Sequence, residues 1–345
     1  MPAISLMGNI AADLGSENTY IVTDEKAPVF RCASAVLIDA KRSSDVYAIG
    51  DDAKRMEGRA GEETVLVSHI SYGAVADAEL AAVLILGAVE KAGARHKPLE
   101  KSRLVLTIPE GATRVERAAL ANAAKLSGAK RVLIVKSPVA AAVQLKRHID
   151  KAEAQLIISI GSSVTEVTVV SAYGTVLNRH MKTGSAAFDD AITEYVRKTH
   201  GLVIPRTVSS ELKKELGSAI KTDMESLQTL SGRDVRTGKP VTARITSADI
   251  SEAISSPITA LINAICDALY HIPADFSSDL LKNGLCLTGG GSEIYALAQR
   301  LREETKLDVF QSEFPSFDTV CGAWKIAQDD RLTRAAINAY SAYEV

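Results

Sequence analysis

The chain has 345 residues, 46% of them hydrophobic and 24% charged, and its formal net charge at pH 7 is −2. This composition is typical of a soluble globular protein and gives no general attraction to nucleic acid, so no nucleic-acid partner is expected, while the length predicts two domains. Four scattered cysteines argue against a metal cluster or a disulfide framework, and with an N-terminus unlike a signal peptide they indicate a cytoplasmic protein.

The first 150 residues predict strands and helices in alternation. Residues 9–22 predict two strands joined by a turn of small residues. The other strands expected here are 33–39, 46–50, 104–108 and 131–135, and the expected helices are 78–91, 113–128 and 139–148. The alternation favours an α/β layer architecture. The longest apolar helix candidate, 80–89, is far shorter than the ~20 residues of a membrane span.

The rest of the chain begins with a second strand–turn–strand segment, residues 156–170. The helices expected after it are 187–200, 208–219, 246–271, 293–304 and 319–328, and the expected strands are 283–287 and 309–311. Residues 221–230 are expected to form a surface loop, and 232–234 and 237–240 are expected to be turns that flank a short strand pair. The tail, 335–345, is expected to be partly helical or loose.

Both hairpins carry the same small-residue turn. At one constant spacing, the residues of the two turns pair as Asp13 with Ser159, Gly15 with Gly161, Ser16 with Ser162 and Thr19 with Thr165. Glycine and serine let the backbone approach an anion and point N–H groups at it, so we expect a duplicated fold with a phosphate between the turns. The alternative is two ordinary hairpins of a repeated fold.

A third glycine-rich segment follows the strand expected at 283–287. Gly289, Gly290 and Gly291 stand between this strand and the helix expected at 293–304. A helix N-terminus offers unpaired N–H groups, so the segment suits a phosphate or a nucleoside. The sequence has no G-x-G-x-x-G fingerprint and no Walker A loop, since residues 217–222 contain only the end of one.

Short motifs along nearly the whole chain resemble those of one family. They lie at 13–19, 73–77, 108–109, 115–117, 138–142, 164–167, 188–189, 195–197, 206–207, 232–234, 237–238 and 287–292. The first resembles the phosphate loop of the actin-like ATPases, and the set resembles the bacterial actin family of MreB-like cell-shape proteins. The resemblance implies an α/β actin-like ATPase fold with two duplicated RNase H-like halves around a nucleotide cleft. These halves are residues 1–150, on which 315–345 pack back, and residues 151–314.

The resemblance also implies ATP or ADP with Mg in the cleft, and it assigns Asp13 to the metal. The residues that it assigns to the nucleotide are Asp13, Gly15, Ser16, Glu17, Asn18 and Thr19 in the first turn, Gly161, Ser162 and Ser163 in the second, Lys213 and Glu215 on the ribose and adenine side, and Gly289, Gly290 and Gly291 below the nucleoside. Taken alone, Lys213 and Glu215 would be interpreted as part of the solvated face of a helix.

Two positions depart from the family pattern. Ser137 stands where the family has a glutamate that orients the attacking water, and Ser159 stands where it has the aspartate of the second phosphate loop. Phosphoryl transfer depends on a positioned nucleophile and on metal-stabilised charge, and loss of a general base costs a factor of ~100 to 10,000 in rate. We therefore expect weak or absent ATP hydrolysis. Glu116, Glu166 and Asp77 are the candidate substitutes.

The resemblance implies a filament that assembles from copies of this chain. Where family members attach to membranes through an apolar loop, this chain has the basic loop 94–101 followed by Arg103. Arg95, Lys97, Lys101 and Arg103 allow weak contact with anionic lipid at the inner membrane face, ~1 kcal/mol per charge, and the alternative is a solvated connection.

Three other functions remain open at this point. A sugar or acetate kinase shares the duplicated fold, but it needs a carboxylate base near the acceptor hydroxyl, where this chain has Ser159. A chaperone-type ATPase needs a peptide-binding domain, for which the chain leaves no room. A filament for DNA segregation or organelle positioning is a variant of the filament function described above. The fold alone does not separate these roles.

Overall fold

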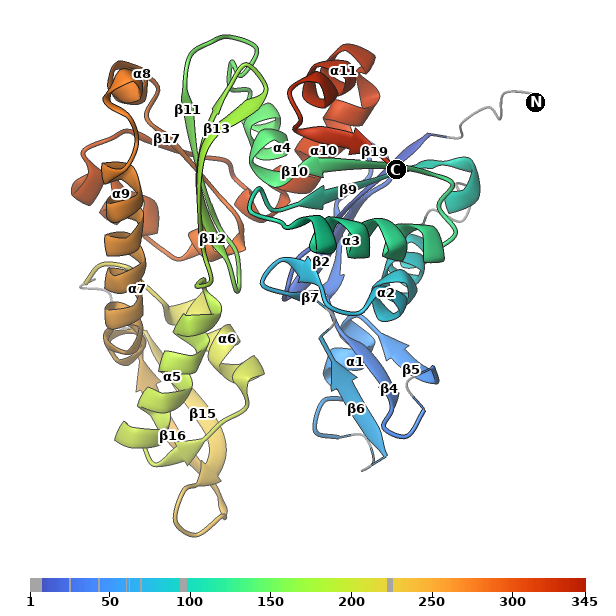
Figure 1. Ribbon diagram of the computed structural model, residues 1–345. Helices are drawn as coiled ribbons and strands as arrows, with labels where there is room; N and C mark the ends of the chain where they lie inside the picture. The colour runs from blue at the N-terminus through green and yellow to red at the C-terminus, as the bar shows by residue number, and fades with distance from the viewer. Residues whose placement is uncertain are drawn as a thin grey trace.

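A computed structural model describes residues 8–345 except 25, 43, 60, 62, 69, 94–97 and 222–225. Two lobes stand side by side, the first coloured blue to blue-green and the second green to orange (Figure 1). The red C-terminal helices lie with the first lobe. Each lobe is built on one mixed sheet with helices packed against it.

The first lobe contains a six-stranded sheet of order β19-β10-β9-β1-β2-β3. Its strands are β1 (Asn9–Leu14), β2 (Asn18–Val22), β3 (Phe30–Ala33), β9 (Arg103–Ile108), β10 (Arg131–Lys136) and β19 (Ala342–Glu344). The β1–β9 and β9–β10 pairs are parallel, and the others are antiparallel. The hairpin expected at 9–22 is therefore confirmed.

The two faces of this sheet follow from the alternation of side chains along each strand. In β9, Leu104 and Leu106 pack in one apolar cluster with helices α2 (Ala78–Lys91) and α3 (Arg114–Leu126). Val105, between them, joins another cluster with α4 (Ser137–Gln144) and α10 (Asp318–Gln328). Helices thus cover both faces of the sheet.

The second lobe contains a five-stranded sheet of order β13-β12-β11-β17-β18. Its strands are β11 (Gln155–Ile160), β12 (Thr165–Ser171), β13 (Gly174–Met181), β17 (Leu285–Thr288) and β18 (Val309–Gln311). Ile157 and Cys286 of this sheet share the cluster of α4 and α10, so these two helices form a common layer between the lobes. They approach so closely that a Cβ atom on Gly322 would lie 1.8 Å from the carbonyl oxygen of Ala140.

The remaining elements complete both lobes. In the first lobe they are α1 (Asp51–Arg55), β4 (Val36–Asp39), β5 (Val46–Ile49), β6 (Thr64–Val67), β7 (Ile70–Ser71), β8 (Ala74–Val75) and α11 (Asp330–Asn338). In the second lobe they are α5 (Ala186–Thr199), β14 (Leu202–Val203), α6 (Arg206–Leu216), β15 (Leu227–Asp234), β16 (Pro240–Thr246), α7 (Ser247–Tyr270), α8 (Ser277–Asn283) and α9 (Leu297–Thr305). Figure 1 shows the β15–β16 hairpin and the β4–β6 sheet at the same end of the molecule.

Several expectations about secondary structure are wrong in part. The helix expected at 139–148 ends at Gln144, because Lys146 adopts a left-handed conformation with φ 55°. The expected loop 221–230 becomes strand β15 from Leu227 onward, and 232–234 lie in that strand rather than in a turn. The helix expected at 293–304 begins only at Leu297, after a 3-10 turn, Gly290–Glu293. The tail, expected to be partly helical or loose, is helical to Asn338, where α11 ends, and then forms strand β19.

The longest apolar helix is α7 rather than 80–89. Among the described residues, α7 is the one helix long and apolar enough to cross a membrane by length and composition. This is weak evidence, since a core helix passes the same test. Along one face, Ile250, Ile254, Ile258 and Ile265 are fully buried in the core of the second lobe.

Candidate functional site

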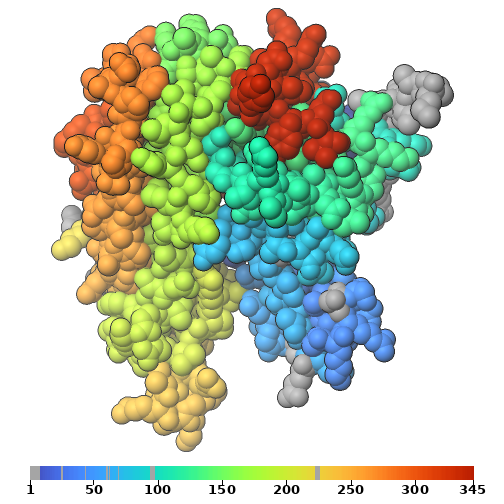
Figure 2. Space-filling model, viewed as in Figure 1, coloured from blue at the N-terminus to red at the C-terminus, as the bar shows by residue number. Residues whose placement is uncertain are grey.

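A cleft of about 870 Å³ runs between the lobes. Both small-residue turns line it, together with helix α6, the segment that follows β17 and the segment that follows β18. Figure 2 shows the lobes in contact near the middle of the molecule and separated by a groove below. The size is that of an ordinary small-molecule site.

The two turns have the same backbone hydrogen bond. The Gly15 N–H donates to the carbonyl of Asn18 at 3.1 Å, and the Gly161 N–H donates to the carbonyl of Val164 at 2.8 Å. A Cβ atom on Gly15 would lie 2.7 Å from the carbonyl oxygen of Asn18, so only glycine fits there.

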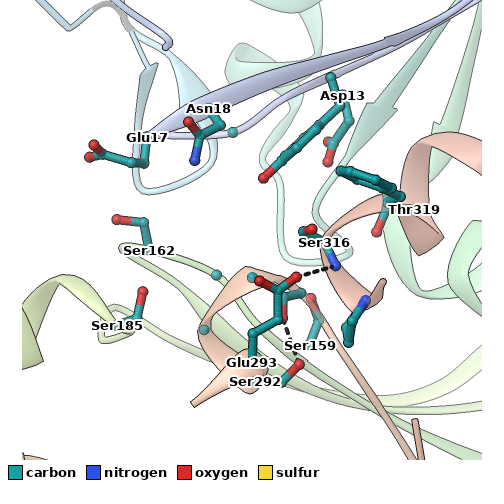
Figure 3. Close-up of a pocket in the computed structure, with 18 of the residues that line it drawn as sticks. Asp13, Glu17, Asn18, Ser159, Ser162, Ser185, Ser292, Glu293, Ser316 and Thr319 are labelled. Atoms are coloured by element: carbon teal, nitrogen blue, oxygen red, sulfur yellow. Dashed lines mark hydrogen bonds between the residues drawn. The ribbon is translucent and has the colours of Figure 1, made fainter. Parts of the chain in front are cut away.

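Each turn leaves backbone donors free. Within the part of the chain that the structure describes, the N–H groups of Ser16, Glu17, Ser162 and Ser163 have no protein acceptor. Figure 3 shows Glu17 and Asn18 facing Ser162 across the cleft. Unpaired N–H groups on consecutive turn residues form an anion-binding concavity.

The turns also touch each other directly. The hydroxyl oxygens of Ser16 and Ser163 lie 2.6 Å apart, and the Gly73 N–H donates to Ser16 at 3.4 Å. This contact divides the cleft from a second, adjoining cavity of about 700 Å³ that Ser16 and Ser163 also line.

Asp13 lies at the end of β1, on the wall of the cleft that belongs to the first lobe (Figure 3). The Thr107 hydroxyl donates to its carboxylate, and burial raises the pKa of Asp13. Tyr20 stands beside it, and burial together with the Asp13 charge raises the pKa of Tyr20 to about 12. A cation near Asp13 would favour its ionised form.

Helix α6 forms another wall of the cleft. Lys213 lines the cleft, but its ammonium group is held by Asp189 at 2.7 Å and by the carbonyl of Ser185 at 3.1 Å. Ser210 and Lys214, one turn apart, line the cleft as well. These two residues were not among the candidates from the sequence.

Glu215 is not part of the cleft, contrary to expectation. Two residues along a helix turn a side chain by about 200°, so Glu215 points away from the direction of Lys213. It is exposed and accepts a hydrogen bond from Gln228 at 3.0 Å.

The three glycines at 289–291 line the cleft, but two of them are required by packing. A Cβ atom on Gly289 would lie 2.5 Å from the carbonyl oxygen of Ile160, and one on Gly291 would lie 2.6 Å from its Cγ2. A Cβ atom on Gly290 would have only Ser316 within reach, at 3.7 Å. The segment is a 3-10 turn, so the expected helix N-terminus is absent here.

Thr19 and two of the proposed carboxylate substitutes lie outside the cleft. The Thr19 side chain is fully buried and pairs with Ser34 at 2.8 Å. Glu116 belongs to the capping box of α3, and Asp77 caps α2. Caps satisfy helix N–H groups and leave little capacity for other ligands.

Ser137, Ser159 and Glu166 do line the cleft. The Glu166 carboxylate already accepts bonds from the Glu110 and Gly111 N–H groups, at 3.3 and 3.1 Å. It is therefore not free to orient a water molecule.

Sequence reasoning missed the end of β18 and the residues that follow it. Residues 311–317 line the cleft, together with Thr319 of α10. Phe314 stacks on Phe317 with ring centroids 5.7 Å apart, and Phe317 meets Tyr20 edge to face at 5.5 Å. The Ser316 N–H donates to Glu293 at 3.2 Å (Figure 3). The available signal was its place after a parallel strand, where α/β sheets bind ligands.

The charge of the cleft is unfavourable for a bare anion. The charged residues that line it are six acids, Asp13, Glu17, Glu166, Asp189, Glu293 and Glu313, and three bases, Arg31, Lys213 and Lys214. Among the described residues, no group of three or more His, Cys, Asp or Glu side chains is placed to hold a metal ion. An anionic ligand would therefore have to bring its own counter-ion.

Comparisons with known proteins agree on one family. Residues 7–334 match the family model described as MreB/Mbl protein. The cell shape-determining protein MreB of Escherichia coli (strain K12) is 31% identical over 310 residues, which cover 89% of this chain and 89% of the relative. The cell shape-determining protein Mbl of Bacillus subtilis (strain 168) is 28% identical over 307 residues, covering 89% and 92%.

Solved structures show the same fold. The crystal structure of MreB5 of Spiroplasma citri bound to ADP has a TM-score of 0.86 and 25% sequence identity, covering 96% of this chain and 98% of that one. The MamK double helical filament has a TM-score of 0.75 and 20% identity, covering 93% and 98%. The expected actin-like α/β fold is thereby confirmed.

Proposed function

Since this chain belongs to the MreB/Mbl family of actin-like cytoskeletal filament proteins, we propose that it binds adenine nucleotide in the cleft and polymerises into filaments. The observation that carries the proposal is the pair of facing turns, whose four N–H groups are without an acceptor in the described chain. MreB5 of Spiroplasma citri, which has this fold, has been solved with ADP and with AMPPNP. The family match does not favour the kinase and chaperone alternatives.

The phosphates would lie between the turns of Gly15–Asn18 and Gly161–Ser163, and the nucleoside toward Ser210, Lys214 and Gly290. The residues fit a metal-bound nucleotide because Asp13 offers one carboxylate beside the turns while the cleft as a whole is acidic. Asp13 would hold Mg together with the phosphates, and the metal would supply the positive charge that the lining residues lack.

Weak or absent hydrolysis is the second part of the proposal. Ser137 and Ser159 line the cleft at the two positions where the family pattern has carboxylates. Glu166 is engaged by backbone donors, so it does not replace them. Without a group to orient the attacking water, bound ATP would persist.

We propose the domain division of residues 1–150 with 315–345, and 151–314. Two contacts support it: β19 pairs with β10 of the first lobe, and α10 packs against β1 and β9. The common layer of α4 and α10 would then act as the floor of the cleft.

We propose that this chain associates with further copies of itself. We also propose that it does so in the cytoplasm. MamK, which has this fold, forms a double helical filament. Contact with anionic membrane remains a weaker proposal that rests on Lys101 and Arg103, since Arg95 and Lys97 lie outside the described residues. No nucleic-acid partner is proposed.

Calorimetric titration with ADP and with AMPPNP, each in Mg and in EDTA, tests the binding site. We expect saturable binding of one nucleotide per chain in Mg and markedly weaker binding in EDTA. No heat of binding for either nucleotide up to ~1 mM would overturn the proposal. Phosphate release from ATP, followed in parallel, should stay close to the rate of the protein-free control.

A further inference from the structure

The two halves are joined beside the cleft by a seam of hydrogen bonds between protein groups. Edge strand β13 and the start of β12 face the loop that follows β9 (Figure 1). We call five residues at this seam the latch: Glu110 and Gly111 of the first half, and Glu166, Thr175 and His180 of the second.

Glu166 is the centre of the latch. Its side chain is only 5% exposed, and its carboxylate accepts the Glu110 and Gly111 N–H groups of the other half. Two side chains of β13 also contact this carboxylate: His180 Nδ1 lies 3.2 Å and Asn178 Nδ2 lies 3.4 Å from Glu166 Oε1. A buried carboxylate with several donors is costly to unpair.

Glu110 makes the reciprocal contact. Its carboxylate accepts the Thr175 hydroxyl of the second half at 2.6 Å and forms an ion pair with Lys136 of its own half at 2.8 Å. The Glu110 and Lys136 side chains are 12% and 15% exposed, so water screens this pair weakly. Each half thus places one carboxylate on donors of the other.

The two halves are in direct van der Waals contact at the seam. A Cβ atom on Gly111 would lie 3.0 Å from the His180 ring, so the loop touches the ring directly. Nearby, the Lys182 ammonium of the second half lies 5.2 Å from the centre of the Tyr72 ring of the first half. Ser16 and Ser163 add the hydroxyl contact between the turns.

We propose that the latch holds the two halves together when no nucleotide is bound. We call this arrangement, in which the seam is in contact, closed. The closed arrangement is then set by hydrogen bonds between protein groups, and nucleotide enters a subunit that is already closed. This goes beyond the proposed function, because it needs no ligand in the cleft.

A distance measurement across the groove, on nucleotide-free protein, tests the proposal. Spin labels would be attached at Glu57→Cys and Glu211→Cys, exposed positions on opposite walls of the second cavity. Cys266→Ser and Cys321→Ser remove the two partly exposed native thiols. We expect one narrow distance distribution in this background. In E166Q, where an amide N–H₂ faces a backbone N–H, we expect the population at longer distances to rise about tenfold.

Asp279→Asn is the matched control, because Asp279 also accepts a backbone N–H, from Ala154 at 2.8 Å, but within the second half alone. It should keep the narrow distribution. Thr175→Val removes only one hydroxyl of the latch and decides the question if E166Q does not fold. A folded E166Q or Thr175→Val variant with the unchanged, narrow distribution would overturn the proposal. The outcome is independent of nucleotide binding, since no nucleotide is present.

Discussion

The two turns that face each other across the cleft have the same backbone and different chemistry. In each turn, a glycine N–H donates to the carbonyl three residues later, Gly15 to Asn18 and Gly161 to Val164. The strand before each turn runs parallel to a central neighbour, β9 in one lobe and β17 in the other. The duplication is therefore one of backbone geometry.

The side chains beside the turns separate their roles. Asp13 brings a carboxylate to the first turn, whereas Ser159 brings only a hydroxyl to the second. The glycines impose the turn, and the metal site that we propose at the first turn depends on the single residue Asp13. Repeated structure thus does not imply repeated chemistry. Two predictions test this contrast directly, and two further ones concern Ser137 and the latch.

The largest expected effect is on metal-dependent binding. Asp13→Asn should weaken Mg-nucleotide binding about 100-fold, because it removes the carboxylate beside the phosphates. Ser159→Ala should change binding by less than about threefold, since its hydroxyl carries no charge. Calorimetry in Mg measures both. Equal losses in the two variants would contradict the contrast between the turns.

The second prediction concerns the packing behind the second turn. Gly291→Ala should lower the free energy of unfolding by about 2 kcal/mol, because the new Cβ atom would lie 2.6 Å from Ile160 Cγ2. Gly290→Ala is the control, since its Cβ atom meets only Ser316 at 3.7 Å. Urea unfolding measures the difference. If the two variants were equally stable, Gly291 would not be needed for packing.

The third prediction concerns the rate of ATP hydrolysis in the cleft. Ser137→Glu should raise the rate of phosphate release from ATP about tenfold, because it adds a carboxylate that can orient water. Ser137→Gln has nearly the same shape without the charge and should leave the rate unchanged. An assay of inorganic phosphate compares them, and an unchanged rate in Ser137→Glu would mean that position 137 does not limit hydrolysis.

The smallest effect is a pH dependence of the latch. The hydrogen bond to Glu166 raises the pKa of His180 above its ordinary 6.5, with Glu116 adding to the shift and Lys182 opposing it. The charged ring therefore stabilises closure fully below about pH 6.5, and this contribution is lost as the pH rises through the raised pKa. We expect a few-fold larger open population at about pH 8 than at about pH 6.

His180→Gln is the comparison for this prediction, because it can still donate to Glu166 but cannot titrate. The spin-label distances measured at both pH values should then agree in the variant. A variant that kept the full pH dependence would assign it to another group.

Features coded locally could be predicted from the sequence. Thr113 and Thr246 begin helices through capping boxes with Glu116 and Asp249, and the two hairpins are where alternation and glycine predict them. The expected short strand pair is present as β15 and β16. The extent of β15 was not predicted, because only its Leu230 is buried and the strand lacks an apolar pattern.

Features set by tertiary packing could not be predicted. The glycines at 289 and 291 point to a ligand from the sequence, but they are required by the approach of Ile160 from another strand. Thr19 aligns with Thr165, yet both hydroxyls turn into the protein, toward Ser34 and the carbonyl of Thr183. For the two threonines, motif position predicted the backbone and not the direction of the side chain.

Sedimentation of the purified protein in Mg-ATP, in Mg-ADP and without nucleotide is the most direct test of the account. A filament subunit that protein contacts hold closed should pellet above a critical concentration in all three conditions, with similar critical concentrations. Pelleting only in Mg-ATP would contradict closure by the latch. Protein that stays in the supernatant under every condition would contradict the proposed polymerisation itself.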